Sequence, residues 1–443
     1  MKQSTSLSLA APSALHGELT LPGDKSLSHR AALFAALAAG ESTIDRFLVS
    51  GVTRALLNAL TALKVPWHLD QNRLTVKSKG FQQFVAPEDP VYCGNSATTI
   101  RLVAGALAAA GIPCTLDGSE GLRKRPMTRI TDPLVQMGVS IVTTNGCAPM
   151  HIKPRSAAAP LNAIDYTLPV ASAQVKSCLI LAALAANGTC TFREPGPSRD
   201  HTERMLRSMG ASIRTPAAGV VEVDPLNVPL TPLKLTLPGD ISSAAFLLVA
   251  TAIVPGSEII IRDVGINPTR TGILDVLREM GASITISNER LEAGEPVGNI
   301  HLVAAPLHAI TVKGDTVVRM IDEFPIFAIA AAAATGVTHV HEAEELRYKE
   351  TDRIAILCKE LRKLGLTIDE YTDGFSIQGR TLRGGIANAC GDHRLAMSLA
   401  LAGLISPEPV TVEHAEIYHE SFPSFTSTLE MLGVRASEKP LIH

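Results

Sequence analysis

A motif of about seventy residues recurs six times along this 443-residue chain, and it restricts the fold more than any other feature. In each copy a helix ends with a hydrophobic residue, a glycine and a small or apolar residue, directly before a strand. The first copy has Lys64 in place of the glycine, and the other five carry Gly138, Gly210, Gly281, Gly365 and Gly433. Glycine at this position is typical of a left-handed helix C-cap.

A second recurring signal is a polar turn about 40 residues before each helix end, followed by a long apolar helix. These turns lie at 23–26, 94–96, 171–173, 239–242, 320–322 and 391–393. Each copy therefore predicts a strand, a buried helix, a strand, an exposed helix and a further strand. Six such copies fill the chain, so we expect an α/β fold.

The two halves of the chain also match. The hexamer Leu-Thr-Leu-Pro-Gly-Asp stands at 19–24 and again at 235–240. If like copies pack symmetrically, the N-terminal ends of their first helices converge. Each such end carries unpaired N–H groups and about half a positive charge. The repeat therefore predicts a binding site for anions.

Composition excludes several classes of function. The net charge of −3, one Trp and five Tyr argue against a nucleic-acid partner or an anionic membrane. Seven scattered Cys without paired spacing are typical of reduced thiols. Residues 1–17 do not resemble a secretory signal, and no apolar run approaches a bilayer span of about 20 residues. We expect a cytoplasmic protein.

Basic and polar side chains collect near the predicted helix starts. They include Lys25, Ser26, His29, Arg30, Asn95, Thr98, Arg101, Arg125, Arg129, Ser172, Gln174, Lys176, Arg199, Arg347, Lys349, Arg353 and Arg394. A single surface Arg or Lys is usually only a solvated charge. Recurrence at equivalent positions of a repeat favours anion binding for the set.

Eight ordered motifs then identify a family. They are Gly-Asp-Lys-Ser-Leu-Ser-His-Arg (23–30), Gly-Asn-Ser-Ala-Thr-Thr (94–99), Arg-Pro-Met (125–127), Ala-Ser-Ala-Gln-Val-Lys-Ser (171–177), Asn-Pro-Thr-Arg-Thr-Gly (267–272), Glu-Leu-Arg-Tyr-Lys-Glu-Thr-Asp-Arg (345–353), Asp-His-Arg-Leu-Ala-Met (392–397) and Ser-Phe-Pro (421–423). Along essentially the full chain, this sequence resembles the 5-enolpyruvylshikimate-3-phosphate (EPSP) synthase family.

The resemblance implies two domains, each of three βαβαββ repeats arranged as an inside-out α/β barrel. One domain would comprise residues 1–22 and 238–443 and the other 23–237, with crossovers near Pro22 and Pro238. The implied enzyme is a 3-phosphoshikimate 1-carboxyvinyltransferase of the shikimate pathway to aromatic amino acids. It moves the enolpyruvyl group of phosphoenolpyruvate to the 5-hydroxyl of shikimate 3-phosphate, in a cleft closed between the domains, and releases phosphate.

The resemblance also implies roles for individual residues. Phosphoenolpyruvate would be held by Lys25, Asn95, Ala97, Arg125, Gln174, Arg353 and Arg394. Shikimate 3-phosphate would be held by Ser26, Arg30, Ser172, Ala173, Gln174, Ser198, Arg199, Asp322 and Lys349. Asp322 would act as base and Glu350 with Lys25 as proton carriers, since addition and elimination need one acid and one base. Asp322 also suits a helix N-cap, and the two roles are compatible.

We expect no cofactor, no metal, no nucleic-acid or membrane partner, and a monomer whose partners are its two small-molecule substrates. Two weaker metal candidates are His339 with His341, and His414 with His419 among glutamates. Neither has a third ligand at metal spacing.

Three positions depart from the family's usual pattern. Residues 50–52 lack an acidic residue, Glu420 replaces a substrate-facing Lys of some members, and Ala97 replaces a common Gly. A methyl group at Ala97 would narrow the phosphoenolpyruvate pocket, so we hypothesise tolerance of the longer inhibitor glyphosate; a neutral variant is the alternative.

Other functions stay open at this point. The first two departures leave room for a diverged paralogue acting on a related cyclic alcohol. The related transferase class that uses UDP-N-acetylglucosamine carries a Cys in the loop that is here 118–124, and this loop has none. A non-enzymatic binding module would lack the acid–base residues, whereas Asp322, Lys349 and Glu350 are present.

Overall fold

The computed structural model describes residues 4–156 and 159–441, so positions 1–3, 157–158 and 442–443 of the predicted domains lie outside the described residues. The chain divides into two compact units. Unit 1 comprises 1–22, 239–290 and 296–443, and unit 2 comprises 23–238 and 291–295. The short segment 291–295, at the turn of a hairpin, was not singled out from the sequence.

Unit 2 contains three four-stranded sheets. Their strand orders are β14 (Lys234–Thr236), β3 (Ala39–Asp45), β5 (Arg73–Lys79), β4 (Trp67–Asp70); β6 (Val91–Tyr92), β7 (Cys114–Asp117), β9 (Cys147–Ile152), β8 (Ile141–Thr144); and β10 (Asp165–Thr167), β11 (Cys190–Arg193), β13 (Val220–Val223), β12 (Ile213–Ala217). In each sheet the first two strands are parallel and the other neighbours antiparallel. This is the order that a βαβαββ repeat produces.

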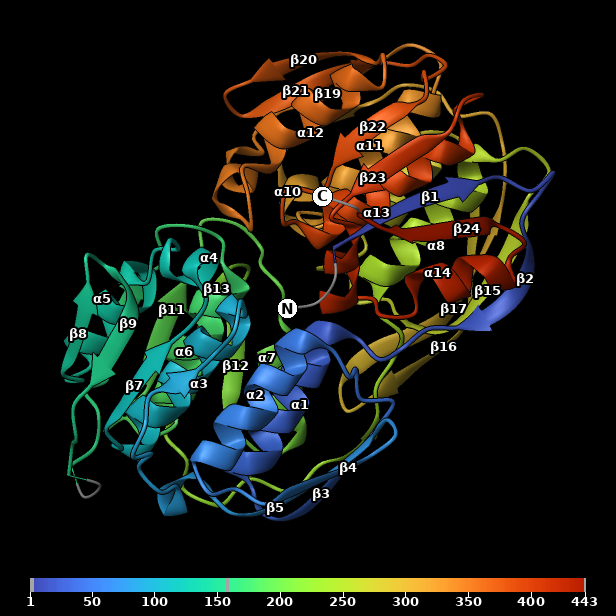
Figure 1. Ribbon diagram of the computed structural model, residues 1–443. Coiled ribbons are helices and arrows are strands. Elements are labelled where there is room, and N and C mark those ends of the chain that lie inside the picture. The colour runs from blue at the N-terminus through green and yellow to red at the C-terminus, as the bar shows by residue number, and fades with distance from the viewer. Residues whose placement is uncertain (1–3, 157–158, 442–443) are drawn as a thin grey trace. The chain divides into compact units, whose positions relative to one another are not determined.

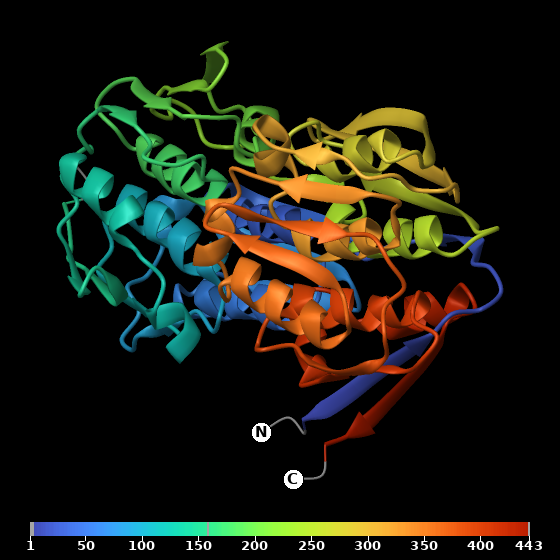
Figure 2. The ribbon, with the colours of Figure 1, turned by 90° about the horizontal axis from the view of Figure 1, so that it is seen from above.

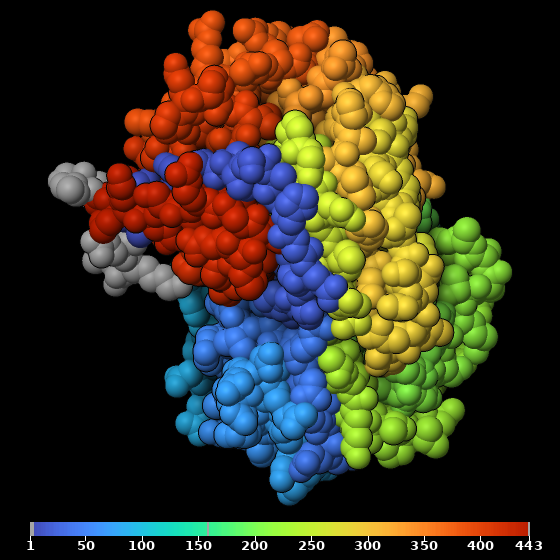
Figure 3. Space-filling model, turned by 90° about the vertical axis from the view of Figure 1, so that its right-hand side faces the viewer, coloured from blue at the N-terminus to red at the C-terminus, as the bar shows by residue number. Residues whose placement is uncertain are grey.

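Unit 1 has the same architecture. Its sheets are β2 (His16–Thr20), β15 (Glu258–Gly265), β17 (Glu295–Val303), β16 (Ser283–Glu292); β18 (Thr311–Val312), β19 (Val337–Val340), β21 (Gly374–Gln378), β20 (Thr367–Tyr371); and β22 (Gly385–Asn388), β23 (Val410–Glu413), β1 (Thr5–Ala10), β24 (Arg435–Pro440). The last sheet takes β1 from the start of the chain, and β1 lies antiparallel beside β24 (Figure 2). The corresponding N- and C-terminal segments are adjacent on the face shown in Figure 3.

The first helix of each repeat is buried. These helices are α1 (Lys25–Leu37), α3 (Ala97–Ala110) and α6 (Ala173–Ala183) in unit 2, and α8 (Ile241–Ile253), α11 (Phe324–Ala333) and α13 (His393–Leu401) in unit 1. Within unit 2, α3 packs on α1 and α6, and within unit 1, α11 packs on α8 and α13 (Figure 1). All thirteen residues of α8 are buried, because this helix is apolar on every side. Helices inside and sheets outside confirm the inside-out α/β fold of six repeats.

The remaining helices are partly exposed. They are α2 (Gly51–Ala62), α4 (Glu120–Arg123), α5 (Thr128–Gln136), α7 (His201–Ser208), α9 (Gly272–Glu279), α10 (Asp315–Arg319), α12 (Arg353–Lys363) and α14 (Phe425–Met431), with 3₁₀ turns η1 (Phe81–Gln83), η2 (Glu344–Tyr348), η3 (Ala402–Leu404) and η4 (Ala415–Glu420). The five repeat glycines have φ between 83° and 111°, which confirms the predicted left-handed caps. Lys64 adopts φ 58°, so the first copy keeps the turn without the glycine.

The duplicated hexamer exchanges strands between the two units. The strand that ends within the first hexamer, β2, pairs with β15 of unit 1, and β14, which ends within the second hexamer, pairs with β3 of unit 2. The Asp24 N–H donates to the Pro238 carbonyl at 2.8 Å, and the Asp240 N–H donates to the Pro22 carbonyl at 3.4 Å. Each repeat therefore combines the strand of one hexamer with the helix that follows the other.

No helix among the described residues is long and apolar enough to cross a membrane.

Candidate active site

The start of α1 carries the first candidate residues of unit 2. Asp24 caps the helix, because its carboxylate accepts from the Leu27 N–H at 2.8 Å. Lys25 and Ser26 follow in the first turn and are partly exposed. Arg30, one turn further, is 2% exposed. Its guanidinium donates to the Thr202 Oγ1 at 2.8 Å, the Ser177 Oγ at 2.9 Å and the Ser26 carbonyl at 3.1 Å. Arg30 is therefore a fixed, interior cation.

Burial shifts the proton affinity of two groups on α1. Burial lowers the pKa of the Arg30 guanidinium to about 10, partly offset by the carboxylate of Glu203. Burial likewise lowers the pKa of His29 to about 4. Its ring nitrogens lie 2.8 Å from the Lys25 carbonyl and 3.3 Å from the Ser96 Oγ. His29 is thus neutral at pH 7 and is a structural residue.

Gln174 at the start of α6 is held by two residues of α3. The Arg101 guanidinium donates to its amide oxygen at 2.6 Å, and its amide nitrogen donates to the Thr98 Oγ1 at 3.0 Å. Arg101 also donates to the Pro126 carbonyl at 3.2 Å, next to Arg125. Arg101 and Thr98 belong to the basic and polar set, but no local pattern predicts that they fix Gln174.

The other candidates of unit 2 lie on helix starts and loops. Ala97 is the first residue of α3 and is 4% exposed, and the Asn95 amide oxygen accepts from the Ser119 Oγ at 3.0 Å. Ser172 caps α6, directly before Ala173, with its Oγ 3.5 Å from the Val175 N–H. Ser198 and Arg199 lie between β11 and α7, and the Ser198 hydroxyl donates to Glu194.

In unit 1 the predicted base, Asp322, lies between two arginines. Its carboxylate oxygens are 3.4 Å from the Arg353 Nη1 and 3.4 Å from the Arg394 Nη2. Arg353, 1% exposed, also contacts Asp392 at 2.7 Å and Glu350 at 2.6 Å. Burial lowers the pKa of Arg353, but the carboxylates of Asp392, Glu350 and Asp322 outweigh burial and raise it above its ordinary value. Unit 1 therefore brings together four of its five candidates: Asp322, Glu350, Arg353 and Arg394.

The fifth candidate, Lys349, ends the 3₁₀ turn η2 beside this cluster. Its Nζ is 3.8 Å from the Glu345 Oε1. Burial lowers the pKa of Lys349, and the carboxylates of Glu345 and Asp322 oppose that shift. An ammonium with a lowered pKa gives up a proton more readily, which suits a residue near proton transfer.

The predicted N-cap role of Asp322 is wrong. Helix α11 begins at Phe324, and Glu323 occupies the cap position without a side-chain cap bond. Glu323 is 1% exposed and accepts a hydrogen bond from Ser242. Pro325 is the second residue of α11, where its missing N–H removes no intrahelical hydrogen bond.

The structure explains one of the positions that depart from the family pattern and locates another. Ser50 and Thr53 form a capping box at the start of α2, so a neutral hydroxyl stands where an acidic residue is usual. Glu420 ends the 3₁₀ turn η4 and is partly buried.

The rings of His339 and His341, one of the two metal candidates, stack with centroids 6.1 Å apart. No group of three metal-ligating side chains occurs among the described residues.

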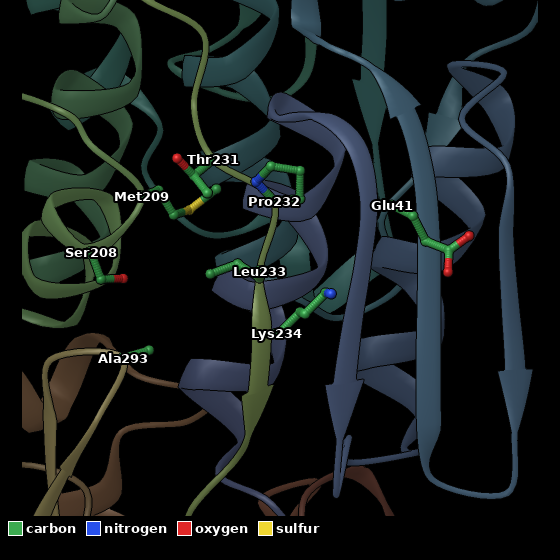
Figure 4. Close-up of a pocket in the computed structure, with 8 residues that line it drawn as sticks. All are labelled: Glu41, Ser208, Met209, Thr231, Pro232, Leu233, Lys234 and Ala293. Carbon is green, nitrogen blue, oxygen red and sulfur yellow. The ribbon is translucent and has the colours of Figure 1, made fainter.

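A separate hollow of about 580 Å³ lies in unit 2, away from these side chains. Its lining residues are Glu41, Ser208, Met209, Thr231, Pro232, Leu233, Lys234 and Ala293. Figure 4 shows Pro232 and Leu233 in the middle of this set, with Met209 and Glu41 on opposite sides. None of the predicted site residues lines it.

Comparison with known proteins gives one family. The family model described as EPSP synthase (3-phosphoshikimate 1-carboxyvinyltransferase) matches residues 9–429. The chain is 46% identical to the 3-phosphoshikimate 1-carboxyvinyltransferase of Geobacter sulfurreducens, over 97% of this chain and 100% of that protein. It is 45% identical to the enzyme of that name from Legionella pneumophila strain Philadelphia 1, over 96% and 97%. A solved EPSP synthase from Acinetobacter baumannii superposes with a TM-score of 0.87 and 38% identity, covering 98% of this chain and 100% of that one.

Proposed function

Because the chain belongs to the EPSP synthase family, we propose that it transfers the enolpyruvyl group of phosphoenolpyruvate to the 5-hydroxyl of shikimate 3-phosphate and releases phosphate. The observation that carries the proposal is Asp322, a carboxylate held at 3.4 Å from both Arg353 and Arg394. One group of side chains thus supplies a proton acceptor and two cations for an anionic substrate.

The 3.4 Å distances from Asp322 to Arg353 and Arg394 are long for ion pairs, which suits a base that must give up these arginines when the substrate binds. Charge-assisted N–H···O contacts are ordinarily about 2.7–2.9 Å. We propose that the carboxylate and phosphate of phosphoenolpyruvate take over Arg353 and Arg394, together with Lys25, Asn95, Ala97, Arg125 and Gln174. Asp322 then loses cationic partners, its affinity for a proton rises, and it accepts the proton of the 5-hydroxyl.

The reaction is an addition followed by an elimination. The 5-hydroxyl oxygen bonds to C2 of phosphoenolpyruvate while Glu350 or Lys25 delivers a proton to the methylene carbon. A proton then leaves the new methyl group, the C–O bond to phosphate breaks, and the enol ether and phosphate are formed. Glu350 lies 2.6 Å from Arg353. When phosphoenolpyruvate binds Arg353, the charge around Glu350 changes, and its proton affinity changes with it.

Shikimate 3-phosphate is proposed to bind the helix starts of unit 2 and the acid cluster of unit 1. Its proposed ligands are Ser26, Arg30, Ser172, Ala173, Gln174, Ser198, Arg199, Asp322 and Lys349. Two features support this assignment: Arg30 is already fixed by three hydrogen bonds, and Gln174 by two. Side chains that are already ordered before binding lose less conformational entropy when they bind an anion.

We further propose that units 1 and 2 are the two domains of the enzyme, and that it acts as a cytoplasmic monomer without cofactor, metal, nucleic-acid or membrane partner. The names of the relatives favour shikimate 3-phosphate over a related cyclic alcohol as acceptor.

The test is phosphate release from phosphoenolpyruvate with each of two acceptors, shikimate 3-phosphate and UDP-N-acetylglucosamine, at equal concentration. We expect release only with shikimate 3-phosphate, and a product heavier than that substrate by one enolpyruvyl group. Release with the nucleotide sugar, or with neither acceptor, would contradict the proposal.

A further inference from the structure

Lys176 lies two residues after Gln174 in the first turn of α6, where the sequence suggested an anion-binding cation. Its side chain is instead only 2% exposed. The Nζ is 2.6 Å from the Glu194 Oε2 and 2.8 Å from the Glu203 Oε1, and both carboxylates are 3% exposed. Burial by itself lowers the pKa of Lys176, but Glu203 and Glu194 outweigh burial and raise it. Lys176 is therefore charged and occupied by partners inside unit 2.

These three residues come from three different segments. Lys176 belongs to α6, Glu194 directly follows β11, and Glu203 lies in the first turn of α7. The Lys176 Nζ is also 3.5 Å from the Ser198 carbonyl, while the Ser198 hydroxyl donates to Glu194. The segment 194–200, which contains Ser198 and Arg199, is thus held through its backbone and through a side chain.

A second set of contacts connects α6 and α7 to α1. Arg30 donates to Thr202 of α7 and to Ser177 of α6, and the two hydroxyls lie 2.6 Å apart. Ser177 follows Lys176 and Thr202 precedes Glu203, so these contacts and the Lys176 ion pairs together connect α1, α6 and α7 around two buried cations and two buried carboxylates. Burying a balanced set adds little stability, but it fixes the geometry of the segments that contribute to it.

We propose that Lys176, Glu194 and Glu203 are positioning residues, which hold the starts of α1 and α6 and the 194–200 segment in the arrangement that binds shikimate 3-phosphate. The inference rests on the proposed function, because it assigns a role in binding that substrate. None of the three residues needs to touch the substrate. Lys176 acts through Gln174 on its own helix, and Glu194 acts through Ser198 and Arg199 on its own segment. Glu203 holds Lys176 and follows Thr202, which accepts a hydrogen bond from the proposed ligand Arg30.

The test separates the reach of the carboxylate from its charge. Glu194→Asp keeps the charge but withdraws the carboxylate by about one methylene, so it cannot contact both Lys176 and Ser198. We expect the KM for shikimate 3-phosphate to rise about tenfold, a loss of about 1.4 kcal/mol in binding. We expect kcat and the KM for phosphoenolpyruvate to stay within about threefold. Glu194→Gln keeps the reach and should have the smaller effect.

Glu360→Asp is the matched control. Glu360 is 0% exposed in unit 1, pairs with Lys363 at 2.7 Å and accepts from the Asn388 N–H at 2.9 Å. It is a buried carboxylate that pairs with a lysine and accepts a hydrogen bond, and it has no proposed part in binding. Its shortening should lower the melting temperature without changing either KM.

Three outcomes would overturn the inference: a folded Glu194→Asp with a KM for shikimate 3-phosphate within twofold of wild type, a larger effect from Glu194→Gln, or an equal rise in Glu360→Asp. If Glu194→Asp does not fold, Glu203→Asp takes its place, since it shortens the other carboxylate that pairs with Lys176 and keeps its charge. It should raise the same KM about threefold, and an unchanged KM would also overturn the inference. Absence of turnover in the wild type would instead contradict the proposed function.

Discussion

The two copies of the duplicated hexamer lead into helix starts with the same cap and different surroundings. Asp24 caps α1 through the Leu27 N–H, and Asp240 caps α8 through the Ser242 N–H at 2.9 Å. After Asp24 come the partly exposed Lys25 and Ser26. After Asp240 come Ile241, 1% exposed, and Ser242, 2% exposed.

The surroundings of Ser242 explain the difference. Its Oγ accepts from the Arg270 Nη2 at 2.8 Å and donates to the Glu323 carboxylate, and Arg270 also contacts Asp240 at 3.1 Å. At the start of α8, Arg270 and Glu323 of unit 1 therefore occupy the hydrogen-bonding groups of Ser242. At the start of α1, Lys25 and Ser26 remain partly exposed to solvent. We infer that duplication gave two equivalent helix starts, of which one serves ligand binding and the other serves the core.

Lys25→Met should produce the largest loss. It removes the cation that we place beside phosphoenolpyruvate and in proton transfer, so we expect kcat/KM to fall by about 10³-fold or more. The melting temperature should change little, because Lys25 is partly exposed. Steady-state phosphate release measures the effect, and Lys79→Met, at an exposed lysine of the same unit, is the control. A loss below tenfold would place Lys25 outside the chemistry.

Asp322→Asn should have the next largest effect. It keeps the size of the side chain and removes the proton acceptor, so turnover should fall by about 10²-fold while the affinity for shikimate 3-phosphate stays within several-fold. Calorimetric binding and single-turnover kinetics separate the two quantities, with the exposed Asp315→Asn as control. Near wild-type turnover would show that Asp322 only organises Arg353 and Arg394.

Acid should destabilise unit 2 through His29. Its pKa of about 4 in the folded chain lies below the ordinary 6.5, so the unfolded state binds more protons between these values. The stability gained from neutral His29 is present above pH 6.5 and is lost as pH falls toward 4. We expect a loss of about 2 kcal/mol between pH 7.5 and pH 5 from this residue.

The counterpart of His29 in α8 is Ala245, which does not titrate. Urea unfolding at the two pH values measures the effect, and His29→Gln should remove this part of the pH dependence. An equal acid loss in His29→Gln would assign the sensitivity to other groups.

Ala97→Gly tests how much room the start of α3 leaves for a ligand. The methyl group of this buried residue narrows the space, at a cost of roughly 1–3 kcal/mol to a ligand that clashes with it. We expect glyphosate to inhibit Ala97→Gly about tenfold or more tightly than wild type at fixed phosphoenolpyruvate. Micromolar inhibition of the wild type, unchanged by the substitution, would make Ala97 a neutral difference.

Local rules made much of the fold predictable from the sequence. Glycine at the helix ends has a direct backbone meaning, so the caps at Gly138 and its four equivalents followed from composition and spacing alone. The six repeats followed in the same way. The exchange of β2 and β14 followed only from the family resemblance, which placed crossovers near Pro22 and Pro238, because the two hexamers are identical and do not determine which strand pairs with which helix.

The side-chain clusters were only partly predictable. The motifs contain Asp322, Arg353 and Arg394, but their mutual distances depend on how α11, α12 and α13 pack. Lys176 appeared as one more cation because its partner Glu194 is 18 residues further along the chain. Pairing over such a separation is set by tertiary packing, which no local pattern records.

The contrast between the two helix starts is tested most directly by measuring KM and melting temperature for Ser26→Ala and Ser242→Ala side by side. Ser26→Ala should raise the KM for shikimate 3-phosphate several-fold and leave the melting temperature unchanged. Ser242→Ala should leave both KM values within twofold and lower stability by about 1–3 kcal/mol, because it removes a buried hydroxyl that accepts from Arg270 and donates to Glu323. The opposite pattern, with KM changed by Ser242→Ala and stability changed by Ser26→Ala, would contradict the account.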